Sequence, residues 1–77
     1  MECFVCNAEA EELPTSGDYV PVNCPQCGEY RVVGTVAHDL RYKGRWLQAE
    51  AMRQWIAEQR EKGAERPMIN SGNVIWG

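Results

Sequence analysis

Four cysteines, arranged as two Cys-x-x-Cys pairs, constrain the fold of this chain more than any other feature. The pairs are Cys3 with Cys6 and Cys24 with Cys27, and seventeen residues separate them. Two pairs at this separation match the ligand spacing of tetrahedral zinc sites, and four thiolates fill the coordination shell without leaving a position for substrate. The sequence therefore predicts one closed, structural Zn²⁺ site.

Other uses of the cysteines fit the sequence less well. Disulfides are rare in an intracellular chain without a signal peptide, and a redox pair is expected beside a βαβ pattern. Iron bound by the same thiolates remains an alternative. His38 is the only histidine. We expect it to have a surface or packing role, because the cysteines already complete the shell.

The residue after each pair supports a tight metal-binding turn. Such a turn needs a left-handed residue just past its second cysteine, and Asn7 and Gly28 occupy these two positions. Glycine adopts a positive φ without a Cβ penalty, and asparagine tolerates it better than most residues. We call residues 3–7 the first knuckle and residues 24–28 the second knuckle.

The length of the chain makes the metal important for folding. A chain of 77 residues forms one small domain at most. A core of this size rarely supplies more than about 3–5 kcal/mol, whereas a structural zinc contributes ~10–16 kcal/mol. The sequence has neither a secretory h-region nor an apolar run long enough for a membrane helix, so the expected location is the cytoplasm.

Charge is distributed unevenly along the chain. Residues 1–30 contain six acidic and no basic side chains, whereas residues 31–77 contain eight basic and five acidic ones, and the net charge is −3. Four thiolates around Zn²⁺ add further negative charge to the N-terminal part. This part is therefore expected to repel a phosphate backbone.

Two strands are predicted around the second knuckle. Tyr19–Val22 and Glu29–Val33 are rich in β-branched and aromatic residues and form a hairpin with the second knuckle at its tip. Pro21 lacks an N–H group, so the first strand is expected to be an edge or to end there. Residues 8–17 are acidic and rich in turn formers, which indicates a solvated loop.

Two helices are predicted in the second half. Thr35 is the expected N-cap of a short helix over Val36–Tyr42, and a longer amphipathic helix runs from about Trp46 to Lys62 and stops at Gly63. The hairpin offers little surface to cover the apolar stripe of this longer helix. The part of the stripe left uncovered is therefore predicted to dock on a protein partner or a second copy. The candidate partner face comprises Leu47, Met52, Trp55, Ile56 and Trp76.

One stretch combines basic and aromatic residues. Such interleaving can contact phosphates and stack on bases, although three basic residues are a small electrostatic footprint. The alternative is a loop whose aromatic side chains cover the core while its charges stay in water. The candidate nucleic-acid contacts are Arg31, Arg41, Tyr42, Lys43, Arg45 and Trp46.

These motifs resemble known families in two places. Residues 1–34, with both cysteine pairs followed by Tyr30-x-Val32, resemble a zinc ribbon of the rubredoxin-like kind. True rubredoxins have a wider gap between the pairs and no counterpart of the long helix. Residues 55–73 are similar to the segment that follows the ribbon in a group of uncharacterised bacterial and phage proteins, where the ribbon heads a longer chain. This similarity implies a recognition or accessory module.

The expected fold class is a small metal-stabilised α+β domain. A zinc ribbon with a β-hairpin spans residues 1–34, and a helical extension with one amphipathic helix, residues 35–77, packs on or beside it. We find no convergent nucleophile, acid and base. The expected function is therefore that of a structural zinc protein acting as a non-catalytic interaction or accessory module, with no membrane or small-molecule partner. Nucleic-acid binding is the first alternative and iron redox chemistry the second.

Overall fold

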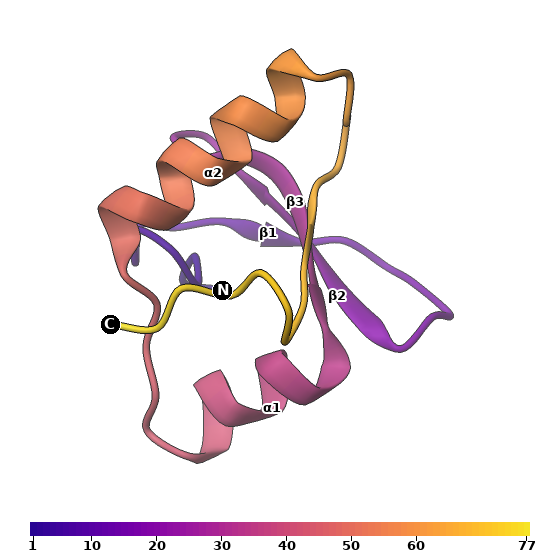
Figure 1. Ribbon diagram of the computed structural model, residues 1–77. Helices are drawn as coiled ribbons and strands as arrows, with labels where there is room; N and C mark the ends of the chain where they lie inside the picture. Colours follow the sequence, from indigo (N-terminus) through magenta and orange to yellow (C-terminus); the bar gives the residue numbers. More distant parts are fainter.

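A four-stranded sheet and two helices make up the fold in the computed structural model, which describes residues 1–77 (Figure 1). The strands lie in the order β1-β2-β3-β4; β3 and β4 are parallel, and the other neighbours are antiparallel. The expected small α+β fold is thus confirmed. Neither helix is long and apolar enough to cross a membrane. In chain order the elements are β1 (Glu11–Glu12), β2 (Tyr19–Cys24), β3 (Gly28–Val33), α1 (Gly34–Tyr42), α2 (Ala49–Glu61) and β4 (Met68–Ile69).

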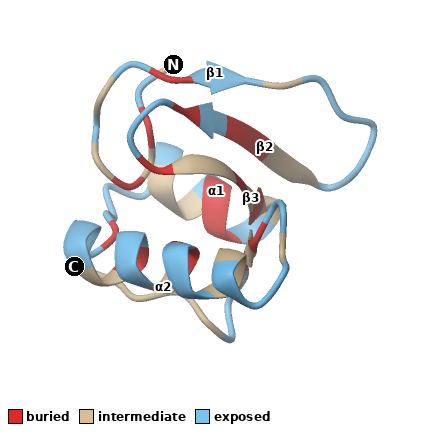
Figure 2. Ribbon diagram, turned by 90° about the horizontal axis from the view of Figure 1, so that it is seen from above, coloured by how far each residue is buried: buried red, intermediate tan, exposed pale blue.

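The predicted hairpin is formed by β2 and β3. Cys24 pairs with Gly28, so the second knuckle is the turn of the hairpin. Along β3, Tyr30 and Val32 are fully buried and alternate with partly exposed neighbours. This period of two places one face of the strand in the core (Figure 2).

Strand β2 is internal in the sheet and not an edge strand, but Pro21 lies where the pairing of β2 with β1 ends, which agrees with the expectation of an edge or an end. The short strand β1, inside the segment expected to be a loop, pairs with β2 through Glu12 and Val22. The N–H of Leu13 then donates to the carbonyl of Pro21 at 2.9 Å. Because the N and O atoms of a strand residue face the same neighbour, the missing N–H of Pro21 faces the point where β1 ends.

Both halves of the chain contribute to the sheet. β4 comes from the C-terminal part and lies beside β3, where the N–H of Arg31 donates to the carbonyl of Pro67 at 2.8 Å. Farther on, Trp76 forms an antiparallel bridge with Leu47. The C-terminal residues therefore pack against the segment that joins the two helices.

Helix α1 starts without the expected side-chain cap. It begins at Gly34, its N-cap is Val33, and no side chain caps it, so the prediction of Thr35 as N-cap is wrong. The N–H of Gly34 instead donates to the carbonyl of Asp18 at 2.9 Å. The helix continues directly from β3, and the backbone of the residue just before β2 satisfies its first donor.

Helix α2 begins three residues later than expected and ends where expected. The side chain of Gln48 accepts a hydrogen bond from the N–H of Ala51 at 2.9 Å and caps the helix. Residues 46–48 are bonded instead to residues 75–77, which we call the C-terminal strip; for example, the N–H of Gly77 donates to the carbonyl of Trp46. Gly63 follows the helix with a φ of 99°.

Three of the five predicted partner-face residues lie in the core. Leu47, Met52 and Ile56 are buried, and they pack with the inner face of the sheet in one hydrophobic cluster. They are therefore not exposed for a partner, which corrects that prediction, because the C-terminal strip and the sheet together cover the apolar stripe of α2. Trp55 and Trp76 are half-buried against the same cluster.

We expect truncation of this core to destabilise the protein. Ile56→Ala should lower the free energy of unfolding by about 2–5 kcal/mol, because it removes transfer energy and leaves a cavity in a closed core. Denaturant unfolding of the metal-loaded protein measures this. Glu58→Ala, at an exposed position of the same helix, is the control and should change stability by less than about 0.5 kcal/mol. Equal effects of the two substitutions would contradict this packing.

Candidate metal centre

The four cysteine sulfurs converge on one centre. All four Sγ atoms lie within 4.8 Å of one another. Two distances join the knuckles, 3.9 Å from Cys3 to Cys27 and 3.6 Å from Cys6 to Cys24. Tetrahedral coordination with metal–sulfur bonds of about 2.3 Å places sulfurs about 3.8 Å apart. The cluster therefore has the dimensions of a single four-thiolate metal site.

This geometry also bears on the alternative uses of the cysteines. All four are free thiols, and both distances between the knuckles greatly exceed a disulfide bond of about 2.05 Å. His38 is not part of the ligand group. Its exposed side chain lies beside Asp39 and packs against Tyr42, with the two rings tilted and their centroids 5.0 Å apart.

The backbone of both knuckles has the predicted conformation. Asn7 and Gly28 have φ angles of 63° and 82°. In the first knuckle, the N–H of Asn7 donates to the carbonyl of Cys3 at 3.0 Å, and the N–H of Val5 points at the sulfur of Cys3 at 3.4 Å. The turn thus directs a backbone donor toward a ligand sulfur.

Three ligands are buried and one is partly exposed. Cys3, Cys24 and Cys27 are buried, whereas Cys6 is only partly covered. Cys6 and Cys27 line a surface groove of about 870 Å³ whose other wall is α2. Cys6 is therefore the ligand closest to solvent.

The surroundings of the thiols shift their pKa values in different directions. Burial raises the pKa of Cys3, and burial together with the negative charge of Cys3 raises the pKa of Cys27. Burial also acts to raise the pKa of Cys24, but the backbone N–H groups of Cys27 and Gln26 outweigh it and lower that pKa to about 7. Without metal, at least two of the thiols keep their protons at neutral pH, so metal binding must release them.

Arg60 holds the second knuckle from outside. Its Nη1 donates to the carbonyl of Cys27 at 3.2 Å, and its Nη2 donates to the carbonyl of Glu29. A Cβ atom at Gly28 would collide with this guanidinium. Gly28 thus provides both a positive φ and the space for Arg60. The sequence placed Arg60 only in the last turn of α2, and no local signal pairs it with the knuckle.

Tyr30 contacts the first knuckle from inside. Its hydroxyl lies 3.0 Å from the sulfur of Cys3 and accepts a hydrogen bond from the N–H of Phe4 at 3.1 Å. Sequence reasoning assigned Tyr30 to a strand but not to the site. The alternation of residues along β3 predicts that Tyr30 faces inward, and this alternation is the sequence feature that could have indicated its contact with the site.

Most of the predicted nucleic-acid residues line hollows in the surface. Arg31 donates to the carbonyl of Arg66 at 3.0 Å, and the two line one shallow hollow. Arg41, Arg45 and Trp46 line another. Tyr19, whose ring lies 5.6 Å from the Arg31 guanidinium, lines a third hollow together with Arg41 and Tyr42.

Basic side chains of the Arg41–Trp46 stretch have partners within the chain. Arg41 pairs with Glu12 at 2.7 Å, and Lys43 lies 3.6 Å from Asp39. The guanidinium of Arg45 lies 3.7 Å from the ring centroid of Trp76. These partners leave less free positive charge than the sequence suggests.

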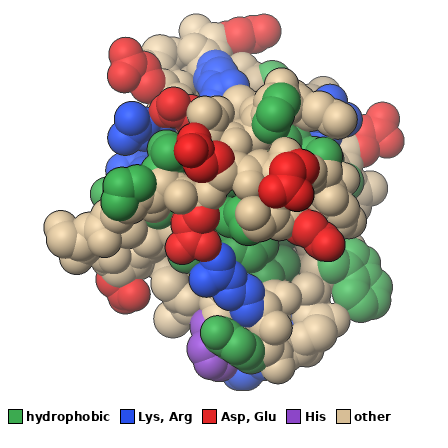
Figure 3. Space-filling view, turned by 180° about the vertical axis from the view of Figure 1, so that it is seen from behind, with side chains coloured by type: hydrophobic (Ala, Val, Ile, Leu, Met, Phe, Trp, Pro, Cys, Tyr) green, Lys and Arg blue, Asp and Glu red, His purple; other side chains and the backbone are tan.

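The aromatic residues of the stretch are uncovered. Tyr42 is 73% exposed and Trp46 is 66% exposed, and they are the two exposed large hydrophobic residues of the chain. Figure 3 shows hydrophobic side chains standing out from the surface, one of them beside the purple histidine. Acidic side chains lie over the middle and upper part of the same view.

Comparisons of the chain with protein-family models, with curated proteins and with solved structures find no match. The chemistry of the site therefore rests on its own geometry, which is that of a four-cysteine metal centre.

We expect loss of the Arg60 contacts to weaken the fold at the second knuckle. Arg60→Gln removes the forked donor to two carbonyls and should lower the free energy of unfolding by about 1–3 kcal/mol. Arg53→Gln is a matched control on an exposed position of the same helix, and it should cost less than about 0.5 kcal/mol. Urea unfolding of both metal-loaded variants makes the comparison. Equal stabilities of the two variants would argue against a stabilising role for the Arg60 hydrogen bonds.

Proposed function

We propose that the protein binds one Zn²⁺ through Cys3, Cys6, Cys24 and Cys27 and that this metal is structural. The observation that carries the proposal is the convergence of four sulfurs from two knuckles at tetrahedral spacing. Thiolates are the ligands that structural zinc prefers, and a full shell leaves no position for substrate. Iron is the competing metal for the same ligands.

The arrangement of the knuckles supports a zinc-ribbon module. The second knuckle is the tip of the β2–β3 hairpin, and the first knuckle, near the N-terminus, approaches it. A metal at this point cross-links residues far apart in the sequence. In so small a domain its binding energy is of the order of the whole folding energy.

We further propose a non-catalytic role in which the module presents a surface to a protein partner. Tyr42 and Trp46 support this role, because large aromatic side chains left in water are characteristic of binding surfaces. They replace the buried residues of α2 as the candidate contact residues. The guanidinium of Arg45, the residue before Trp46, covers the ring of Trp76.

Nucleic acid is the second candidate partner. The two exposed aromatic residues belong to the stretch that also carries Lys43 and Arg45, and bases stack on such residues. The acidic N-terminal part and the internal ion pair of Arg41 oppose this alternative. A protein partner is therefore the preferred proposal.

The metal proposal predicts about one zinc per chain in the purified protein, measured by elemental analysis. A strong chelator should abolish the native circular dichroism, because the metal supplies the folding energy. Since Cys3 and Cys27 hold protons at neutral pH, zinc affinity should rise with pH and binding should release about two or more protons. Calorimetry in buffers of different ionisation enthalpy measures the release.

Two results would count against this proposal. One is iron in place of zinc after expression with both metals supplied, and the other is a fold that the chelator leaves intact. Cys24→Ser should lose the metal, whereas Ser16→Ala, at an exposed loop position, should retain it.

The partner proposal predicts that Trp46→Ala and Tyr42→Ala abolish capture of a defined protein partner without loss of bound metal. The reason is that these side chains contribute contact area but no core packing. Pull-down with wild-type and variant protein measures it, and Thr35→Ala, on the exposed side of α1, is the control.

Nucleic-acid binding predicts a different result. Anisotropy of a labelled single-stranded oligonucleotide should then show affinity that falls steeply with salt and drops in a Lys43→Ala, Arg45→Ala double variant. Salt-sensitive binding of this kind, with no protein captured, would reverse the order of the two candidates.

A further inference from the structure

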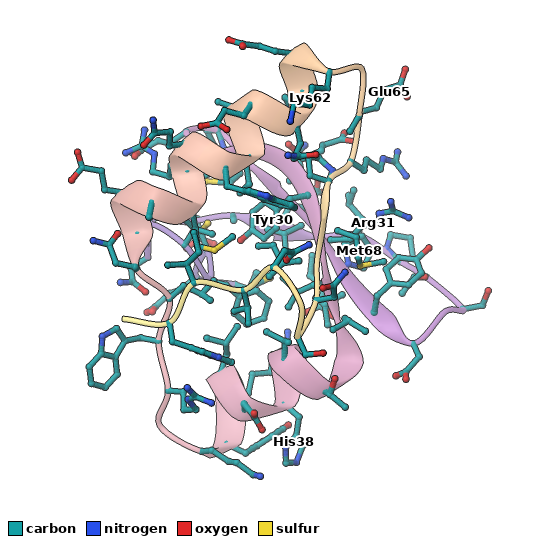
Figure 4. All side chains as sticks on the ribbon, in the orientation of Figure 1. Tyr30, Arg31, His38, Lys62, Glu65 and Met68 are labelled. Atoms are coloured by element: carbon teal, nitrogen blue, oxygen red, sulfur yellow. The ribbon has the colours of Figure 1, made fainter.

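Tyr30 lies in the interior of the molecule, near the centre of the view in Figure 4. It is fully buried, yet its hydroxyl is a polar group that requires partners. Both partners belong to the first knuckle, namely the sulfur of Cys3 and the N–H of Phe4. Both polar contacts of the Tyr30 hydroxyl are therefore made with the first knuckle.

The direction of the two hydrogen bonds follows from their chemistry. A backbone N–H can only donate, so the oxygen of Tyr30 accepts from Phe4 at 3.1 Å. The hydroxyl proton is then available for the sulfur of Cys3 at 3.0 Å. A metal-bound thiolate carries no proton, so in the loaded site Tyr30 must be the donor to Cys3.

We propose that Tyr30 is a positioning residue for the metal centre: its O–H group orients the sulfur of Cys3, withdraws charge from that thiolate and fixes the first knuckle against β3. This inference rests on the proposed metal binding. Outer-shell hydrogen bonds of this kind orient ligands, and their removal costs 10–100-fold in metal affinity.

The position of Tyr30 in the chain gives the contact a second effect. β3 begins at Gly28, the last residue of the second knuckle, and Tyr30 follows two residues later. Its hydroxyl therefore joins the strand that leaves the second knuckle to the backbone of the first knuckle. The two halves of the ligand set are held together by a contact that does not involve the metal.

The test uses the full chain with Co²⁺ as a spectroscopic probe and Zn²⁺ in competition with a chromophoric chelator. Tyr30→Phe keeps the ring and removes the donor. We expect Zn²⁺ affinity to fall 10–100-fold. The thiolate-to-cobalt charge-transfer band should move to longer wavelength, because the Cys3 sulfur loses a hydrogen bond. The amide of Phe4 should exchange its hydrogen faster in the loaded protein.

Tyr42→Phe is the matched control, because it removes a hydroxyl from an exposed tyrosine; affinity and spectrum should not change. If Tyr30→Phe does not fold, 3-fluorotyrosine in a Tyr19→Phe, Tyr42→Phe background isolates position 30. This stronger donor should move the band to shorter wavelength.

The outcomes separate the two proposals. A wild-type protein that takes up neither Co²⁺ nor Zn²⁺ overturns the proposed metal function. A wild type that binds both, with Tyr30→Phe within twofold in affinity and with an unmoved band, overturns the role of Tyr30 alone. An unmoved band in the fluorotyrosine protein does the same.

Discussion

The structure depends on bringing four sulfurs, carried by two turns distant in sequence, to within coordination distance of one another. Each turn needs a left-handed residue to direct its sulfurs inward, and Asn7 and Gly28 provide it. Burial disfavours the thiolate form and raises the pKa values of Cys3 and Cys27, and for Cys27 the negative charge of Cys3 adds to the effect. A bound cation offsets both costs. The first knuckle, the end of β2 and the start of β3 are arranged around the four sulfurs.

Two residues outside the ligand set connect the metal centre to the rest of the fold. Arg60 joins the end of α2 to the second knuckle through two backbone carbonyls. Tyr30 joins the first knuckle to β3 through a sulfur and an amide. Both connections satisfy polar groups near the thiolates, so neither knuckle depends on the metal alone for its position.

Local sequence signals predicted the cysteine site and the hairpin. The features that they did not predict, namely β1, β4 and the burial of the partner face, depend on tertiary contacts. Cysteine spacing and the positions of Asn7 and Gly28 are short-range features, and both were correct. β1 and β4 contain two residues each. Their pairing leaves no periodic pattern. The error at the partner face has the same origin, because burial of Met52 depends on a C-terminal strip whose path no local rule fixes.

The parallel pairing of β3 with β4 determines the order in which the sheet can be completed. Both helices lie between these two strands in the sequence, so on the ribosome β3 is made well before β4. All four cysteines are also made early, so the metal centre can form while the outer edge of β3 is still open. Until residues 68–69 arrive, that edge exposes backbone groups that can pair with another chain. A chain whose β4 is not yet paired would therefore hold its four cysteines together while the outer edge of β3 stays open to aggregation.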